Sequence, residues 1–564
     1  MTSSPLSART GGQILVDALR IHGTDTAYCV PGESFLAVLD ALYLSRETIR
    51  LIVCRQEGGA AHMAEAHGKL TGEPGICFVT RGPGSTNASI AVHTARQDST
   101  PLILFIGQVG RDAMGREAWQ EIDYRHMFGH IAKWVDQIDD ARRLPEYISR
   151  AFHVATSGRP GPVVLALPED MLTDLVSVAD APRYRRSAAA PTHEAMDGLS
   201  AELARAERPL VVLGGGGWTR EASADITAFA AKFDLPVACA FRRQDLIDNH
   251  DERYVGEAGL GMDPRIAQRM RDADLLIAVG ARLGETSTQG YTLLNVPRPA
   301  QRLVHVHADP EELGHVYQAD VPVNASMPAF ARAARALAPA GGAGGARWAE
   351  WTRQARADQL DHIRPPASMP GDVDLAQVMV QLRETLPADT IVSNGAGNYT
   401  LWVQRFWRYR GLRTQLAPTS GTMGYGLPAA IAAKLVHPDR TALCFAGDGC
   451  FLMNGQELAT AVQYRLNVIV IVVNNGMYGS IRMHQERHYP GHVWGTALSN
   501  PDFAALARSY GAHGETVTRT ADFAATLERA RGAGKPALIE LQVSPEALSP
   551  KLTVAMLRGG PAAT

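Results

Sequence analysis

The chain of 564 residues is too long for one hydrophobic core, so we expect two to four domains. Hydrophobic residues make up 46% and charged residues 20%, as in ordinary globular proteins, and a formal net charge of -3 gives no basis for binding nucleic acid or an anionic membrane. The longest apolar run, Val468 to Val473, is strand-sized, and the amino-terminal segment lacks the apolar core of a signal peptide. Six scattered cysteines without CxxC spacing indicate reduced thiols, so we expect a cytoplasmic protein without a membrane span.

Strand-sized apolar runs alternate with helical patterns along the whole chain. The predicted strands lie at residues 51–54, 75–80, 101–109, 209–217, 235–240, 274–282, 302–309, 389–395, 441–449, 467–475 and 536–543. Their apolar residues are continuous, which is typical of strands buried on both faces of a parallel sheet. Stretches rich in Ala, Gly and Pro at 185–194 and 337–347 indicate linkers. The predicted fold class is α/β, with three consecutive doubly wound parallel-sheet domains at 1–185, 192–338 and 348–564.

Polar residues follow two consecutive predicted strands in the third domain. Asp448 comes just past the apolar run of one strand and Asn475 just past that of the next, with one crossover helix between them. Because neighbouring parallel strands lie about 5 Å apart, the two side chains are expected to meet at one sheet edge. A carboxylate and an amide oxygen suit Mg²⁺ that takes other ligands from phosphate, and Gly447 and Gly449 would let phosphate approach the backbone. The alternative interpretation is two ordinary surface turns.

This Gly-Asp-Gly motif, followed one crossover later by a paired Asn, resembles the signature of thiamine diphosphate (ThDP) enzymes. Further segments resemble acetolactate synthases in order and spacing, namely residues 55–72, 81–87, 107–121, 155–163, 307–314, 420–435 and 447–461. The resemblance covers residues 10–545. It implies a ThDP-binding fold with a pyrimidine-binding (PYR) domain, a central domain and a diphosphate-binding (PP) domain, in that order.

The resemblance assigns the catalytic role to Glu57. It implies that Glu57 hydrogen-bonds the aminopyrimidine ring of ThDP and drives its activation. Read without the resemblance, a Glu at this place is a helix-terminal residue favoured by the helix dipole. The small residues that follow it would admit a ring at close range.

The other cofactor residues that the resemblance implies lie in the third domain. The carbonyl of Gly421 would accept a hydrogen bond from the aminopyrimidine, and Met423 would be the wedge that bends the cofactor, although a Met among glycines also serves as a gap filler. The implied diphosphate contacts are Gly397, Asn398, Tyr399, Gly447, Gly449 and Cys450. The implied Mg²⁺ ligands are Asp448, Asn475 and the carbonyl of Met477.

The implied reaction is decarboxylation of a 2-oxo acid such as pyruvate, followed by carboligation to a second carbonyl compound to give 2-acetolactate. Gln120 matches a substrate-side Gln of the family, whereas His93 stands where the family has a small residue and is also typical of a surface helix. The biosynthetic enzymes have a Trp at the position of His484 and an Arg at that of Thr286, and Thr cannot grip a carboxylate as Arg does. These two positions therefore do not support a 2-oxo acid as the acceptor, and a C–C lyase of the benzaldehyde lyase or 2-hydroxyacyl-CoA lyase type stays an alternative.

The central domain contains segments that resemble the binding site of a second cofactor. Residues 212–218, 279–285 and 307–313 match segments by which acetolactate synthases contact a non-redox FAD, but relatives bind ADP or CoA there, or nothing. The run of four glycines does not satisfy GxGxxG, so it is weak support for any nucleotide. A flavin- or nucleotide-dependent oxidoreductase is the alternative from another class. The resemblance also implies a homodimer or homotetramer whose cofactor lies between the first domain of one subunit and the third domain of another.

Overall fold

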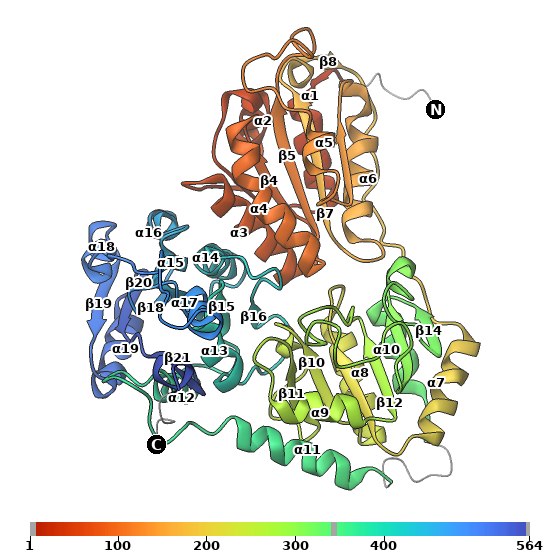
Figure 1. Cartoon of the computed structure of the whole chain (residues 1–564). Helices are drawn as coiled ribbons and strands as arrows, with labels where there is room; N and C mark the ends of the chain where they lie inside the picture. The colour runs from red at the N-terminus through yellow and green to blue at the C-terminus, as the bar shows by residue number, and fades with distance from the viewer. Residues whose placement is uncertain (1–6, 340–346, 560–564) are drawn as a thin grey trace. The chain divides into compact units, whose positions relative to one another are not determined.

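The structure, a computed structural model, describes residues 7–339 and 347–559. The chain forms two compact units, one of residues 1–187 with 431–436 and one of residues 188–430 with 437–564. The first unit contains one six-stranded sheet and the second contains two, and all three sheets are parallel (Figure 1). The predicted α/β class with three parallel-sheet domains is therefore confirmed. Most of the predicted linker at 337–347 lies outside the described residues.

The sheet of the first unit has the strand order β3-β2-β4-β5-β7-β6. Its strands are β2 (Thr26–Cys29), β3 (Arg50–Val53), β4 (Gly75–Val79), β5 (Leu102–Gln108), β6 (Trp134–Gln137) and β7 (Pro162–Pro168). Its helices are α1 (Gly11–His22), α2 (Leu36–Leu44), α3 (Glu57–Thr71), α4 (Pro83–Asp98), α5 (Tyr124–Phe128) and α6 (Leu144–Thr156), and β1 (Arg9–Thr10) pairs with β8 (Leu175–Val176). Helix α1 packs against α2 and α6, whereas α3 packs against α4, so helices cover both faces of the sheet.

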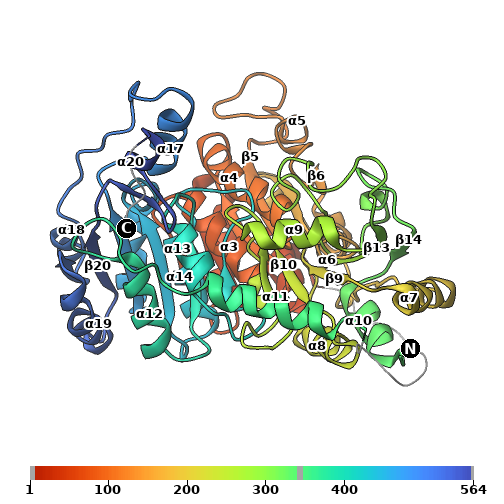
Figure 2. The same cartoon turned by 60° about the horizontal axis from the view of Figure 1, so that its bottom comes forward.

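The central sheet has the order β11-β10-β9-β12-β13-β14. Its strands are β9 (Pro209–Leu213), β10 (Val237–Ala240), β11 (Tyr254–Ala258), β12 (Leu275–Val279), β13 (Arg302–His307) and β14 (Val321–Asn324), with helices α7 (His193–Arg205), α8 (Arg220–Phe233), α9 (Pro264–Asp272), α10 (Met327–Ala336) and α11 (Ala349–His362). Helices α9 and α11 lie side by side at the β11 edge, held by ion pairs from Arg265 and Arg269 to Asp358 (Figure 2).

The third sheet has the order β16-β15-β17-β18-β20-β19. Its strands are β15 (Ile391–Asn394), β16 (Gln415–Leu416), β17 (Ala442–Gly447), β18 (Val468–Asn474), β19 (His513–Val517) and β20 (Ala537–Gln542). Its helices are α12 (Leu375–Thr385), α13 (Thr400–Phe406), α14 (Gly426–Val436), α15 (Asp448–Phe451), α16 (Leu458–Gln463), α17 (Gly479–His488), α18 (Phe503–Ser509), α19 (Phe523–Gly532) and α20 (Val554–Leu557), and β21 (Ala547–Ser549) pairs with β22 (Leu552–Thr553). The continuous apolar runs explain the inner strands, because β17 and β18 are buried along almost their whole length.

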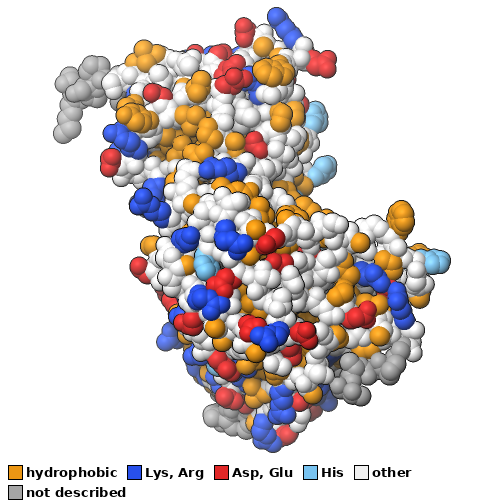
Figure 3. Space-filling model, turned by 90° about the vertical axis from the view of Figure 1, so that its left-hand side faces the viewer, with side chains coloured by type: hydrophobic (Ala, Val, Ile, Leu, Met, Phe, Trp, Pro, Cys, Tyr) orange, Lys and Arg blue, Asp and Glu red, His pale blue; other side chains and the backbone are white. Residues whose placement is uncertain are grey.

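The surface agrees with the modest net charge. On the face that Figure 3 shows, acidic and basic side chains are interspersed rather than gathered by sign. Within the described ranges, no helix is long and apolar enough to cross a membrane. All six cysteines lie in the described ranges, and each is buried and outside any disulfide.

Candidate active site

Asp448 and Asn475 lie at the same edge of the third sheet. Strands β17 and β18 are hydrogen-bonded neighbours, with Gly447 in register with Val473. Asp448 directly follows β17 and starts the short helix α15, and Asn475 directly follows β18. The carboxyl ends of two adjacent parallel strands therefore carry the acidic and amide side chains that the sequence pairs.

The carboxylate of Asp448 faces the turn that follows β18. Its Oδ1 accepts a hydrogen bond of 2.9 Å from the amide of Gly449, and the amides of Gly476 and Met477 also favour its ionised form. Only 3% of Asp448 is exposed, and burial raises the pKa of its carboxyl above the usual range. Because the donors around it are uncharged N–H groups, a bound cation would supply the missing positive charge.

Asn500 was not predicted, and it joins the two strand ends. Its Nδ2 donates to Asp448 Oδ2 at 2.7 Å and to Asn474 Oδ1 at 2.9 Å. Asn474 in turn donates to Glu540 at 2.7 Å, while the side-chain oxygen of Asn475 accepts from the amide of Met477 at 3.2 Å. The first Asn of the pair thus anchors the turn, and the second stays on the loop beside Asp448. No sequence signal indicated Asn500, because it follows no strand and lies in a region of irregular structure.

Cys450 connects two of the predicted cofactor loops. The hydroxyl of Tyr399 donates to its sulfur at 3.4 Å, and the amide of Gly424 donates to the same sulfur at 3.3 Å. The Tyr399 hydroxyl also accepts from the amide of Gly395 at 3.0 Å. The side chains of Tyr399 and Cys450 are therefore used inside the protein, and they fix the 395–399 loop against the 420–424 loop.

Two predicted cofactor glycines have backbone conformations that favour glycine. Gly397 has φ of 143° and Gly421 has φ of 66°, both in the region that L side chains rarely adopt. A Cβ on Gly421 would meet nothing within 4 Å, so the main chain there borders open space. Met423 is half-buried and packs against the core of the third domain, so the rest of its side chain is accessible.

Asn398 ties the predicted diphosphate loop to the start of α17. Its Oδ1 accepts from the hydroxyl of Ser480 at 2.8 Å, and its Nδ2 donates to the carbonyl of Gly479 at 3.3 Å. Helix α17 carries His484 and His488, both exposed, with their rings parallel and their centroids 6.3 Å apart. The helix that carries His484 is thus held directly by a predicted cofactor residue.

An ion cluster around the buried side chain of Glu486 attaches the C-terminal segment (residues 547–558) to α17. The carboxylate of Glu486 is fully buried and accepts from Arg558 at 2.6 and 2.9 Å and from Arg482 at 2.8 Å. These contacts lower the pKa of Glu486 to about 2, with the Arg558 hydrogen bonds as the largest cause. Beside this cluster, Val554 packs against Met477. The segment therefore supports the loop that carries a predicted Mg²⁺ ligand.

We expect the contribution of Glu486 to stability to depend on pH. Because the folded-state pKa lies below the ordinary value of 4.5, ionised Glu486 stabilises the fold above pH 4.5, and this contribution is lost as the pH falls toward about 2. Glu486→Gln should thus lower the unfolding midpoint at pH 7, by an amount that shrinks below pH 4.5. Calorimetry of both proteins across this range measures the difference. A difference of constant size at every pH would contradict this assignment.

Glu57 is the first residue of α3 in the first unit. The helix is capped by Gln56, whose side chain accepts from the amide of Gly59 at 3.0 Å, so Glu57 is not the capping residue. The carboxylate of Glu57 instead accepts from Nδ2 of Asn87 at 2.9 Å. The small residues after it serve helix packing, because a Cβ on Gly58 would lie 3.2 Å from the Asn87 carbonyl on α4.

Gln120 and His93 have different surroundings in the first unit. Gln120 has φ of 67°, and a Cβ on Gly82 would lie 2.8 Å from the Cβ of Gln120, so the loop that carries Gln120 closes on the start of α4. Asn87, the partner of Glu57, lies one turn further along α4. His93 is exposed in the second half of the same helix and makes none of these contacts. Gln120 therefore lies at the helix end that also bears the partner of Glu57, and His93 lies away from it.

The three segments of the central domain that were matched to FAD contacts lie at the ends of β9, β12 and β13, which are neighbours in the sheet. They are residues 212–218, 279–285 and 307–313. Packing explains two of the glycines: a Cβ on Gly215 would lie 2.1 Å from the carbonyl of Gly280, and one on Gly280 would lie 2.5 Å from that of Gly214. The glycine run thus allows two backbones to approach closely and is not in itself a sign of a nucleotide. The positions of the motifs, at the carboxyl ends of the strands, are those at which such sheets bind ligands.

Comparison with known proteins gives three family matches along the chain. Residues 9–127 match the N-terminal TPP binding domain of thiamine pyrophosphate enzymes, residues 196–334 the central domain, and residues 395–541 the C-terminal TPP binding domain. The chain is 33% identical over 546 residues to the acetolactate synthase large subunit of Parasynechococcus marenigrum (strain WH8102), covering 95% of this chain and 87% of the relative. It is 31% identical over 557 residues to the isozyme 1 large subunit of Escherichia coli (strain K12), covering 97% and 96%. It is 30% identical over 542 residues to the isozyme 2 large subunit of that strain, covering 94% and 95%.

Proposed function

The chain belongs to the thiamine pyrophosphate enzymes of the acetolactate synthase type, and from this premise we propose that it decarboxylates a 2-oxo acid and joins the remaining fragment to a second carbonyl compound. With pyruvate in both roles, two pyruvates and one proton give one 2-acetolactate and one CO₂. The observation that carries the proposal is the buried carboxylate of Asp448 at the junction of β17 and β18, facing the turn at Gly476 and Met477.

The residues of the third domain fit ThDP and Mg²⁺. We propose that Asp448, Asn475 and the Met477 carbonyl hold the metal, because a buried carboxylate among neutral donors favours a cation. The diphosphate contacts would be main-chain groups of Gly397, Gly447, Gly449 and Cys450, with Asn398 and Tyr399 fixing the loops around them. Gly421, next to open space, would present its carbonyl to the aminopyrimidine above Met423.

When bound, ThDP supplies a nucleophilic carbon that adds to the 2-oxo acid and an electron sink for the loss of CO₂. Glu57 would hold a proton at the aminopyrimidine ring, oriented by the hydrogen bond from Asn87. Gln120, on the loop that closes on the start of α4, would contact the substrate. The protein thereby provides the proton and orients the reacting groups, and the cofactor provides the nucleophilic carbon and the electron sink.

We propose that the residue at position 484 selects the acceptor. His484 is smaller than the Trp of the biosynthetic enzymes and can hydrogen-bond, so acceptors other than 2-oxo acids should compete well. We expect His484→Trp to raise the ratio of kcat/KM for pyruvate over that for an aldehyde acceptor by about threefold to tenfold, as a change in one contact allows. His488→Trp, on the same exposed face one turn later, is the matched control and should leave the ratio unchanged.

The measurement is a panel of 2-oxo acids, aldehydes and ketones with product identification by mass. Equal ratios in both variants would contradict the role of position 484. Cleavage of added 2-hydroxy ketones faster than carboligation would instead favour the lyase alternative.

We further propose a homodimer or homotetramer that shares cofactor sites between subunits. Helix α17 and the loop that follows it expose three large apolar residues. Ile481, Tyr489 and Trp494 have 54%, 67% and 88% of their surface exposed, which supports a contact with another subunit there. Glu57→Gln and Asp448→Ala, each inactive alone, should restore activity when mixed, since one hybrid site would contain both native residues. Failure of mixing to restore activity would contradict a shared site.

For the central domain we propose FAD, supported by the three motifs at the ends of β9, β12 and β13. The absorbance spectrum of the purified protein tests this directly, and ADP, CoA or no ligand are the outcomes that would contradict it. A reducing compartment such as the cytoplasm is supported by six buried cysteines outside any disulfide.

A further inference from the structure

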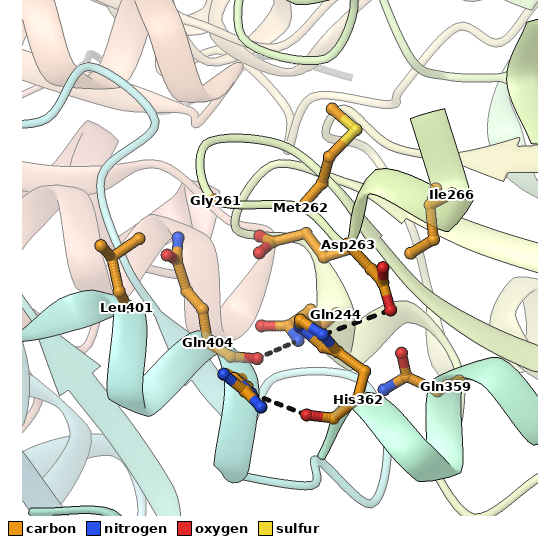
Figure 4. Close-up of a pocket in the computed structure, with 11 residues that line it drawn as sticks. Gln244, Gly261, Met262, Asp263, Ile266, Gln359, His362, Leu401 and Gln404 are labelled. Carbon is orange, nitrogen blue, oxygen red and sulfur yellow. Dashed lines mark hydrogen bonds and ion pairs between the residues drawn. The ribbon is translucent and has the colours of Figure 1, made fainter. Parts of the chain in front are cut away.

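A polar seam joins the central and third domains inside the second unit. On the central side it consists of residues 242–249, which follow β10, and on the other side of residues 404–418 around β16. The amide of Gln244 donates to Gln415 Oε1 at 2.8 Å. The side chain of Gln244 donates to the carbonyl of Gln404 at 2.9 Å (Figure 4). Asn249 exchanges two hydrogen bonds with the main chain of Tyr409. These matched contacts fix the register of the two segments.

Arg242 is the residue of this seam that is nearest in sequence to β10. It is 4% exposed, and its φ of 60° lies in the left-handed region, which costs energy for a residue with a side chain. Its guanidinium Nη1 donates to the carbonyl of Pro418. A charged donor that is buried against a main-chain carbonyl makes a strong and directional contact.

Pro418 begins the loop that presents the predicted aminopyrimidine acceptor. Its carbonyl also accepts a hydrogen bond from the amide of Gly421 at 3.0 Å. The same oxygen therefore accepts from Arg242 of the central domain and from the loop itself. At the other end of the loop, Gly424 is held by Cys450 and by Asn454, which donates to its carbonyl at 3.0 Å. The 418–424 loop is therefore fixed from the central domain at its start and from within the third domain at its end.

Glu257 fixes the backbone of Arg242. Its Oε1 accepts from the amide of Arg242 at 2.5 Å, which stabilises the left-handed conformation there. Glu257 lies on β11 and lines the small cavity drawn in Figure 4, together with Gln244 and Gln404. Burial raises the pKa of Glu257 to about 7, so both its acid and its ionised form accept this hydrogen bond near neutral pH.

We infer that Arg242, held in its conformation by Glu257, is a positioning residue that fixes the 418–424 loop for the cofactor. The inference rests on the proposed function for the identity of the cofactor. The coupling itself, from β11 through Arg242 to the loop, is independent of that identity. It gives the central domain a part in assembling the site.

The test compares Arg242→Met, which removes the donor, with Arg242→Lys, which keeps one. In Arg242→Met we expect amides 419–424 to exchange hydrogen faster in the cofactor-free protein, on the order of tenfold, because a charge-assisted hydrogen bond is lost. The dissociation constant for ThDP, measured by fluorescence quenching at saturating Mg²⁺, should rise by a similar factor. Arg242→Lys should keep most of the wild-type protection of these amides and most of the ThDP affinity. Glu257→Gln, which keeps a hydrogen-bond acceptor, should change neither the exchange nor the affinity strongly.

Arg253→Met is the control, because Arg253 is a half-buried arginine of the central domain whose side chain bonds Asp251 rather than the 418–424 loop. It should leave loop exchange and ThDP affinity unchanged. Native loop exchange and ThDP affinity in a folded Arg242→Met protein would overturn the inference, and so would a Lys variant as impaired as the Met variant. A wild-type protein that does not bind ThDP would refute the proposed function, while faster loop exchange in Arg242→Met would still support the coupling.

Discussion

Replacing Asp448 by Ala should abolish Mg²⁺-dependent binding of ThDP and, with it, catalysis. Asp448 is the one carboxylate among the proposed ligands, and its donors on the protein side are neutral amides. We expect the apparent affinity for Mg²⁺ to fall by more than about a hundredfold. Even replacing a residue that only hydrogen-bonds a metal ligand lowers metal affinity by about ten- to a hundredfold. Titration of the stripped protein with Mg²⁺ at fixed ThDP, followed by tryptophan fluorescence, measures this change.

Measurements of thermal stability distinguish the loss of metal binding in Asp448→Ala from a loss of the fold. A buried carboxylate without a cation is costly, so the metal-free Asp448→Ala protein should unfold at a temperature no lower than that of the metal-free wild type. The wild type should gain stability on addition of Mg²⁺ and ThDP together, and the variant should not. Asp439→Ala, at an exposed turn, should behave as the wild type does. Normal Mg²⁺-dependent stabilisation of Asp448→Ala would contradict the metal assignment.

Replacing Glu57 by Gln should remove catalysis while sparing the binding of both cofactors. The amide keeps the shape of the side chain and can still accept from Asn87, but it cannot hold the ionisable proton that activation requires. We expect kcat to fall by about 10²- to 10⁴-fold, the usual contribution of a general acid or base. Steady-state kinetics with pyruvate, together with a ThDP binding titration, separates the two effects.

Glu47→Gln supplies a matched exposed control, and it should leave kcat unchanged. Asn87→Ala should lower kcat by a smaller factor than Glu57→Gln, because the carboxylate is kept but loses its orientation. A Glu57→Gln enzyme with native kcat would show that Glu57 has only a structural role at the start of α3.

Most inner strands were predictable because burial on both faces makes them continuously apolar, although β2 and β7 were not predicted. Strand β18, VIVIVVN, and strand β5, LILFIGQ, are buried in this way and were predicted within two residues. Edge strands were harder to predict, since one side of each needs no apolar partner. Strands β14 (VPVN) and β19 (HGETV) were missed, whereas the edge strand β3 (RLIV) was predicted. The crossover helix predicted between Asp448 and Asn475 is shorter than a regular crossover, because it begins with a 3₁₀ turn at Gly455–Glu457 and α16 covers only Leu458–Gln463.

The candidate site was predictable only where strand ends determine position. Asp448 and Asn475 follow adjacent strands, so their nearness follows from topology. The contacts of Asn500 and Asn87 depend on loop and helix packing that carries no periodic pattern. Arg242 was missed for the same reason, because its partner Pro418 lies 176 positions away in the sequence. The role of the glycines after β9 also needed coordinates, since close backbone packing and nucleotide binding favour the same residue.

The most direct measurement supplies ThDP and Mg²⁺ separately and together to EDTA-treated, dialysed enzyme with pyruvate as the only substrate. We predict that CO₂ and a five-carbon 2-hydroxy-3-oxo acid of the mass of 2-acetolactate form only when both are present. Product formation at the same rate without ThDP or without a divalent cation, or no turnover of any 2-oxo acid with both present, would contradict the account.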